Sequence, residues 1–127
     1  MIDIRFMPDR TKAQKTKPSI DNILRTVPDE RAFYFYKGMD SPTGIKASNL
    51  EEFLQTLKKV DATSVEFHTG RHDFENWIRM LGDDKLSEQI VALQNKDLSS
   101  VQLHQKLIEI VGLRLGELRE GKDSKTA

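Results

Sequence analysis

The sequence contains no cysteine among its 127 residues. This absence excludes a disulfide framework, a thiolate zinc site and a cysteine nucleophile, and it fits a reducing compartment. Long hydrophobic runs are also missing. No segment approaches the roughly 20 apolar residues that span a bilayer, and the N-terminal MIDIRFMPDR has no apolar run of signal-peptide length. We therefore expect a cytoplasmic protein with no membrane partner.

An excess of charge of one sign is missing as well. The 20 basic and 20 acidic residues cancel, so the field of the whole protein does not attract nucleic acid or anionic membranes. The glycines form neither a phosphate loop nor a G-x-G-x-x-G pattern, and no serine lies in a nucleophile elbow. We therefore expect no catalytic residues, no cofactor and no resident metal, and the sequence leans away from an enzyme.

The residues that are present indicate a globular chain. Hydrophobic residues make up 37% and charged residues 31% of the sequence, which is typical of a folded, well-solvated protein. We predict one α+β domain over residues 19–120, a flexible basic arm over residues 1–18 and a disordered tail over residues 121–127. The basic residues of the arm are Arg5, Arg10, Lys12, Lys15 and Lys17, against Asp3 and Asp9.

The first predicted elements are a short helix and a hairpin. Apolar residues at helical spacing follow Ser19, and Pro28 ends this helix because proline lacks the backbone donor. AFYFY, residues 32–36, has high strand preference, and GIKA, residues 44–47, follows a turn-rich KGMDSPTG. These two strands are expected to pair as a hairpin with a long connection.

The next segment, SNLEEFLQTL, predicts a helix with a capping box. Ser48 is expected to cap the first turn while Glu51 reaches back to it. Leu50, Phe53 and Leu57 recur at helical spacing.

TSVEFH, residues 63–68, alternates apolar and polar residues and predicts a third, half-buried strand. From Asp73 onward the period is helical, with Asp73 as the cap and with Phe74 and Trp77 packed against the sheet. Two further helices follow, the last and longest starting at a Ser99–Gln102 capping box. The predicted fold is therefore α+β, with a small sheet of about three strands, a hairpin plus one strand reached through a helix. Helices cover this sheet, and a helical segment ends the chain.

One stretch, EFHTGRHDFENWI, gathers residues that occur in binding sites. Glu66, His68, Arg71 and His72 all fall within it. His68 and His72 have the four-residue spacing of two metal ligands on one helix face, but the glutamate of the zincin pattern is missing. Glu66 and His68 would point to the same side of the predicted strand, as an acid–base pair requires. The alternative is a structural junction, where a strand ends and a capped helix begins.

A second candidate is the aromatic strand. Phe33 and Phe35 should face one side of it, and Tyr34 and Tyr36 the other. An open tyrosine face would resemble the platforms on which single-stranded RNA bases stack. We expect this face to be covered instead, by the C-terminal helices or by another chain.

The combination FYFYKG, SNLEEF, EFHTGRHDFENWI and LGDDKL resembles a family of small uncharacterised domains found mostly in archaea and some bacteria. Its features are an aromatic strand followed by glycine, a capped S-L-x-E-[FL] helix, a histidine before D-F-x-x-W-I, and a G-D-x-x-L-A segment. The resemblance covers residues 32–90. The chain departs from the pattern at Asn49, an extra residue, and at Ser87, which stands in place of alanine. The resemblance implies a fold unit and transfers no catalytic residues.

The sequence therefore predicts a non-enzymatic interaction or regulatory module that acts through protein–protein contacts, with itself or with another protein. A homodimer that buries Tyr34 and Tyr36 is one version. A small-molecule or metal-binding module at residues 66–73 is the first alternative. RNA binding through the Tyr34 and Tyr36 face is the second.

Overall fold

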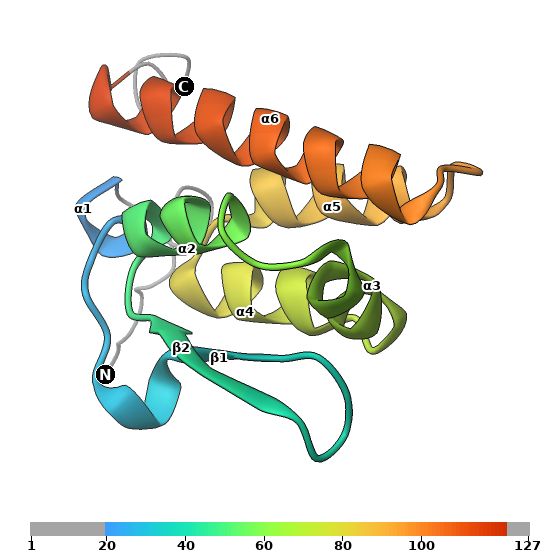
Figure 1. Ribbon diagram of the computed structural model, residues 1–127. Helices are drawn as coiled ribbons and strands as arrows, with labels where there is room; N and C mark the ends of the chain where they lie inside the picture. The colour runs from blue at the N-terminus through green and yellow to red at the C-terminus, as the bar shows by residue number, and fades with distance from the viewer. Residues whose placement is uncertain (1–19, 122–127) are drawn as a thin grey trace, which may run out of the picture.

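A computed structural model describes residues 20–121 of the chain. The predicted arm over residues 1–18 lies outside the described residues, as do residues 122–127 of the predicted tail. The structure consists mainly of helices and contains one small sheet, which confirms the predicted α+β class (Figure 1). The elements are α1 (Ile20–Ile23), η3 (Asp29–Arg31), β1 (Phe33–Tyr36), β2 (Pro42–Ala47), α2 (Leu50–Leu57), α3 (Ala62–Gly70), α4 (Asp73–Leu81), α5 (Asp84–Gln94) and α6 (Ser100–Arg119).

The predicted hairpin forms, but β2 starts at Pro42, two residues earlier than predicted. β1 and β2 pair antiparallel, with Phe33 opposite Ala47, and a register shift follows Tyr34. The first helix is shorter than predicted, because α1 ends at Ile23 rather than just before Pro28. Instead of continuing the helix, the backbone N–H of Val27 donates to the carbonyl of Ser48 at 2.8 Å. This bond ties the chain that enters the hairpin to the chain that leaves it.

The capping residues of α2 are shifted by one position from the prediction. Asn49, not Ser48, is the N-cap, and its side-chain oxygen accepts from the backbone N–H of Glu52 at 2.8 Å. Glu52, not Glu51, reaches back, accepting from the backbone N–H of Ser48 at 2.7 Å. An asparagine side chain caps a helix as well as a serine does. The sequence therefore allowed two capping boxes, Ser48 with Glu51 or Asn49 with Glu52, and did not distinguish them. Glu51 instead pairs with Arg119 of α6.

The predicted third strand is wrong: residues 63–68 belong to helix α3, and in the described residues the sheet has two strands. Ser64 and His68, four residues apart, lie on one side of this helix and are both buried. Because these inward-facing residues are polar, the apolar residues in this segment of the sequence are Val65 and Phe67. They alternate with polar residues, which is the pattern of a half-buried strand.

Helix α4 begins where predicted, but Asp73 is not its cap. The N-cap is His72, whose backbone is left-handed with φ 64°, and no side chain caps the first turn. The packing residues of the helix are confirmed, since Phe74 and Trp77 are buried. Gly82 ends α4 in a left-handed conformation, with φ 108°.

The last two helices follow the prediction closely. Asp83 caps α5 by accepting from the backbone N–H of Leu86 at 3.1 Å. The capping box at Ser99 and Gln102 is present at the start of α6. Figure 1 shows α6 running along one side of the molecule beside α5 and α2, with the hairpin on the opposite side.

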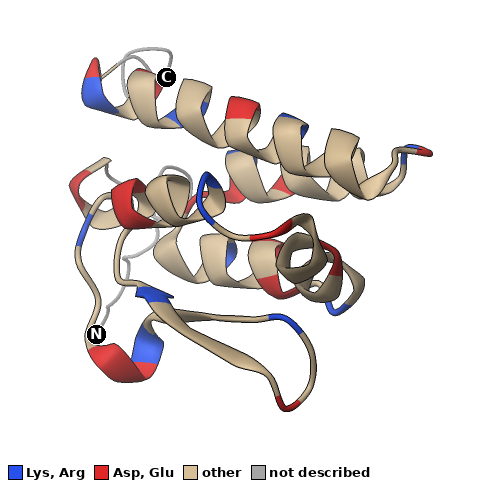
Figure 2. Cartoon of the chain, in the orientation of Figure 1, with Lys and Arg blue, Asp and Glu red and all other residues tan. Residues whose placement is uncertain are grey.

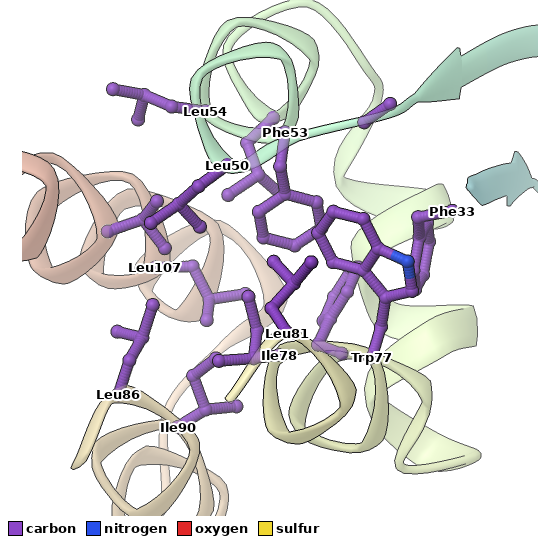
Figure 3. Close-up of a cluster of buried hydrophobic side chains, with 14 of the residues drawn as sticks. Phe33, Leu50, Phe53, Leu54, Trp77, Ile78, Leu81, Leu86, Ile90 and Leu107 are labelled. Carbon is purple, nitrogen blue, oxygen red and sulfur yellow. The ribbon is translucent and has the colours of Figure 1, made fainter. Parts of the chain in front are cut away.

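The core is built from two connected groups of side chains. Rings from the hairpin, α2 and α4 form the first, in which the Trp77 ring lies 5.3 Å from Phe53 and 5.8 Å from Phe33, between centroids. Figure 3 shows the indole between these two rings, and next to it the aliphatic group from α2, α4, α5 and α6. The indole N–H donates to the carbonyl of Arg31 at 2.8 Å, so its polar group is also satisfied. This core fixes one face of the hairpin and leaves the other face outward.

Candidate functional site

A pocket of about 310 Å³ lies where the hairpin meets the end of α3 and the start of α4. Four of the six predicted binding residues line it: Tyr34, Tyr36, His68 and Arg71. The remaining lining residues are Met39, Phe67 and Asp73. The structure thus unites the two sites that the sequence suggested separately, the tyrosine face and the histidine-containing stretch.

Helix α3 holds the strand β1 at the edge of this pocket. The hydroxyl of Ser64 donates to the carbonyl of Tyr36 at 2.7 Å, and the backbone N–H of Tyr36 donates to Nε2 of His68 at 2.8 Å. Two side chains of a helix therefore satisfy the backbone groups of Tyr36, which in a wider sheet would bond a neighbouring strand.

The contacts of His68 determine its protonation state. Because the backbone N–H of Tyr36 can only donate, Nε2 carries no proton. Nδ1 therefore carries the proton and donates to Oδ2 of Asp73 at 2.9 Å. Burial of the ring lowers the pKa of His68, and Asp73 opposes this effect only in part. His68 is thus a neutral histidine with both nitrogens engaged, and neither is available for a metal or for proton transfer.

Arg71 is held in place over the pocket. Its Nε donates to Oδ2 of Asp73 at 3.1 Å, and the carbon at the centre of its guanidinium lies 5.5 Å from the centre of the Phe67 ring. Nη1 contacts the sulfur of Met39 at 3.5 Å. Asp73, predicted as a helix cap, is instead the acceptor that fixes both His68 and Arg71. Such a doubly anchored guanidinium loses little freedom when it binds a further group.

The tyrosine face of the hairpin is open within residues 20–121. Tyr34 is 47% exposed and Met39 70% exposed, while Tyr36 is partly buried. The prediction that the C-terminal helices cover this face is therefore wrong, because α6 lies on the far side of the core (Figure 1). The hydroxyl of Tyr34 donates to the carbonyl of Asp29 at 2.7 Å, which holds the exposed ring in one orientation.

Two of the predicted site residues lie elsewhere. His72 is 66% exposed at its side chain, and its Nδ1 contacts Oε2 of the buried Glu75 at 2.8 Å. Glu75 also accepts from Gln94 of α5 at 2.8 Å, so this group fastens α4 to α5. The hydrogen bond from His72 to the Glu75 carboxylate raises the pKa of His72.

Glu66 is exposed and lines a different hollow, together with residues of the α5–α6 connection such as Lys96 and Leu98. It does not face the same way as His68, because residues two apart on a helix point in different directions. The acid–base pair expected from a strand is therefore not formed. Within residues 20–121 no group of three or more His, Asp or Glu residues could hold a metal ion.

Sequence reasoning missed Met39, Phe67 and Ser64. A helical interpretation of residues 62–70 would have found the last two, because Ser64 with His68, and Phe67 with Arg71, share the four-residue spacing of one helix face. Met39 has no such signal, since it lies in the hairpin connection and reaches the pocket only through the path of that loop.

Charged residues of both signs are distributed over the described elements, and the arms of the hairpin carry few of either (Figure 2). In the described part of the chain no helix is both long enough and apolar enough to cross a membrane. The pocket itself is lined by the rings of two tyrosines, a phenylalanine and a histidine, by a methionine, and by one basic and one acidic side chain.

Comparison with known proteins places the chain in a family but supplies no activity. No curated protein and no solved structure matches it significantly. A family model described as "Family of unknown function (DUF5752)" matches residues 15–112, a range that includes both the hairpin and α3. The chain belongs to this family of unknown function.

Proposed function

We propose that the protein is a non-enzymatic interaction module whose contact surface is the aromatic pocket of Tyr34, Tyr36, Met39, Phe67 and Arg71. The observation that carries the proposal is the outward exposure of Tyr34 and Met39 beside an arginine that is already fixed in place. Tyrosine, methionine and arginine are enriched in protein interfaces, where a few such residues supply most of the binding free energy.

The chemistry of the pocket supports binding rather than catalysis. His68 is the residue that would serve as a general base, but its two nitrogens hold Tyr36 and Asp73. Asp73 in turn holds Arg71. These polar residues form a scaffold that keeps an aromatic surface in shape.

Site-specific photo-crosslinking tests the proposal. A photoreactive benzophenone amino acid replaces Met39 in the full chain, produced in the cells that naturally contain the protein. The matched control carries it at Lys106, an exposed position of α6. We expect one protein to be captured at position 39 and not at position 106. Once purified, this protein should bind the wild type at least about tenfold more tightly than the Tyr34→Ala variant. Identical capture at both positions, or none at position 39, would contradict the proposal.

Self-association is one version of this function, in which two copies bury the tyrosine face against each other. The test is molecular mass by sedimentation over the micromolar range, with Tyr34→Ala and Met39→Ala as variants. A dimer that these variants weaken supports this version. A monomer at all concentrations leaves a different protein as the partner.

Single-stranded RNA is a second candidate ligand, favoured by the exposed ring of Tyr34. RNA binding would need basic residues along the backbone path, and its affinity would fall steeply with salt. Gel retardation of a mixed-sequence RNA at low salt tests it. If no complex forms there, this candidate is excluded.

A further inference from the structure

We propose that the pocket binds a segment of peptide, with an apolar or aromatic side chain between the Tyr and Phe rings. The backbone C=O and N–H of the same residue would bond Arg71 and Asp73. The inference rests on the proposed function and specifies which chemistry the contact surface recognises.

The walls of the pocket suit one side chain of the partner. Tyr34, Tyr36 and Phe67 supply three rings, and Met39 adds a polarizable thioether that adapts to the shape of its neighbour. The cavity of about 310 Å³ lies at the small end of the range for ligand sites. It is therefore matched to an anchor residue and its adjoining backbone rather than to a large cofactor.

The Arg71–Asp73 pair leaves one donor nitrogen and one acceptor oxygen for a ligand. Nε and Nη1 of Arg71 have partners, whereas Nη2 has none within residues 20–121. Both contacts of Asp73, from His68 and from Arg71, fall on Oδ2. Oδ1 of Asp73 therefore has no partner in the same described range. A guanidinium N–H and a carboxylate oxygen are thus both available to one ligand.

An amide fits this pair better than an ion does. The charges of Arg71 and Asp73 cancel, and His68 is neutral, so neither an anion nor a cation gains from the pocket as a whole. A peptide group carries no net charge and offers one N–H and one C=O. The N–H and C=O of one extended residue belong to the two peptide groups on either side of its Cα and point the same way. They can therefore donate to Asp73 and accept from Arg71 without leaving either group desolvated and unpaired.

A nucleobase edge also offers donors and acceptors, but the surroundings favour peptide. Nucleic acids gain most of their affinity from phosphate contacts with Lys and Arg. Lys37, on the hairpin next to β1, is already paired with Asp61 at 3.2 Å. The strand β1 itself, FYFY, contains no basic residue. A partner with an uncharged backbone matches this surface.

The test uses small capped amino acids as probes of the full, isotopically labelled chain. N-acetyl-phenylalanine methylamide and N-acetyl-leucine methylamide are titrated while the backbone amide signals and the Arg71 Nε–H signal are recorded by NMR. We expect millimolar affinity, with shifts concentrated at Tyr36, Phe67 and Arg71. Phenylpropanol, which keeps the ring but lacks the amides, should bind several-fold more weakly. Cytidine and guanosine at equal concentration should bind more weakly than the capped amino acids.

Two variants assign the binding to the pocket. Arg71→Lys keeps the charge but loses the forked donor, and should weaken the capped amino acids by roughly tenfold, the loss expected for one hydrogen bond to a charged group. Arg79→Lys is the matched control, because Arg79 is exposed on α4 and its side chain hydrogen-bonds only Asn76 among the described residues. It should leave the affinity unchanged. Both variants keep the core intact, which the unfolding midpoint checks.

Two outcomes would overturn the inference. Tighter binding of the nucleosides would replace peptide by nucleobase, and no shift at the pocket with any probe would exclude amide recognition. These failures differ from failure of the proposed function. If position 39 crosslinks a partner while the capped amino acids do not bind, the surface is an interface that recognises something other than a peptide amide. If neither experiment is positive, both proposals are wrong.

Discussion

At the residue scale, His68 and His72 are four positions apart and each contacts a carboxylate, but only His68 is buried. His68 is buried among aromatic rings, with its centroid 4.8 Å from that of Phe33 and 5.5 Å from that of Phe74. His72 is exposed beside the carboxylate of Glu75. Burial lowers the pKa of the first, and hydrogen bonding to the Glu75 carboxylate raises the pKa of the second. Their contributions to stability therefore depend on pH in opposite directions.

The sign for each histidine follows from the ordinary pKa of 6.5 in the unfolded chain. Below this value the unfolded chain takes up a proton that native His68 resists, so His68 reduces stability as the pH falls. His72 gains its interaction with Glu75 below the same value and loses it as the pH rises through its raised native pKa. We therefore expect His68→Gln to flatten the decline of stability toward acid, and His72→Asn to steepen it.

Urea unfolding followed by the fluorescence of Trp77, the sole tryptophan, measures both effects between about pH 5 and about pH 8. His68→Gln should also be less stable at neutral pH, because a flexible amide replaces a ring that packs against Phe33 and Phe74 and holds the acceptor of the Tyr36 N–H in place. Exchange of this amide should therefore accelerate. Curves for both variants that run parallel to the wild type would contradict these assignments.

At the scale of secondary structure, α3 shows why part of the site escaped prediction. Hydrophobic alternation is a good guide when the buried positions of an element are apolar. In α3 two buried positions are Ser64 and His68, which are inside because they bond the backbone of β1. The local sequence of α3 contains no information about these hydrogen bonds to a distant strand. The hairpin, α4, α5 and α6 were predictable because most of their buried residues are apolar and most of their boundaries have caps or glycine.

The same limit explains the outcome for the candidate site. Tyr34, Tyr36, His68 and Arg71 were chosen from their residue types, and all four line one pocket. Their proximity was not predictable from local patterns, because β2 and α2 lie between β1 and α3 in the sequence and only the tertiary fold brings β1 and α3 together.

Ser64 offers a test of the contact between α3 and β1. Ser64→Ala removes the donor to the carbonyl of Tyr36 and should destabilise the protein by about 1 kcal/mol, the net value of one such hydrogen bond. Thr63→Ala, one residue earlier in the same helical turn but exposed, is the control and should be neutral or slightly stabilising. Both are measured as shifts in the urea midpoint. Equal effects of the two substitutions would show that the hydrogen bond contributes nothing.

Two glycines at helix ends should respond to alanine with opposite signs. Gly82 ends α4 with φ 108°, where a Cβ is strained, so Gly82→Ala should cost about 1 kcal/mol or more. Gly70, the last residue of α3, has open space at the position of a Cβ. Gly70→Ala should therefore stabilise by about 0.5–1 kcal/mol. The thermal unfolding midpoints of both variants are compared with that of the wild type. A higher midpoint for Gly82→Ala would contradict the left-handed conformation assigned to the end of α4.

At the scale of the whole molecule, a buried ion pair connects the turn between α4 and α5 to the C-terminal helix. The guanidinium of Arg114 bonds both carboxylate oxygens of Asp83, at 2.8 and 2.9 Å, with both side chains almost fully buried. Asp83 also caps α5, and Arg114 reaches Glu117 at 3.2 Å. The pair therefore fixes α6 against the rest of the core, on the side away from the pocket (Figure 1).

Removing one partner of this pair leaves a buried charge without its counter-ion, so the effects of the two removals should not add. Arg114→Leu leaves the Asp83 carboxylate buried without its cation, and should destabilise by about 3–5 kcal/mol. In the double variant Asp83→Asn with Arg114→Leu, the amide still caps α5 and no charge is left unpaired. Its destabilisation should therefore be smaller than the sum of the two single effects by more than about 1 kcal/mol.

Lys106→Leu, on the exposed face of α6, is the control and should change stability by less than about 0.5 kcal/mol. Because the pair lies away from Tyr34 and Arg71, ligand binding at the pocket should be unchanged wherever the variants remain folded. Additive single effects would mean that Asp83 and Arg114 stabilise the fold independently, and the pair would then not be the connection between α6 and the α4–α5 turn.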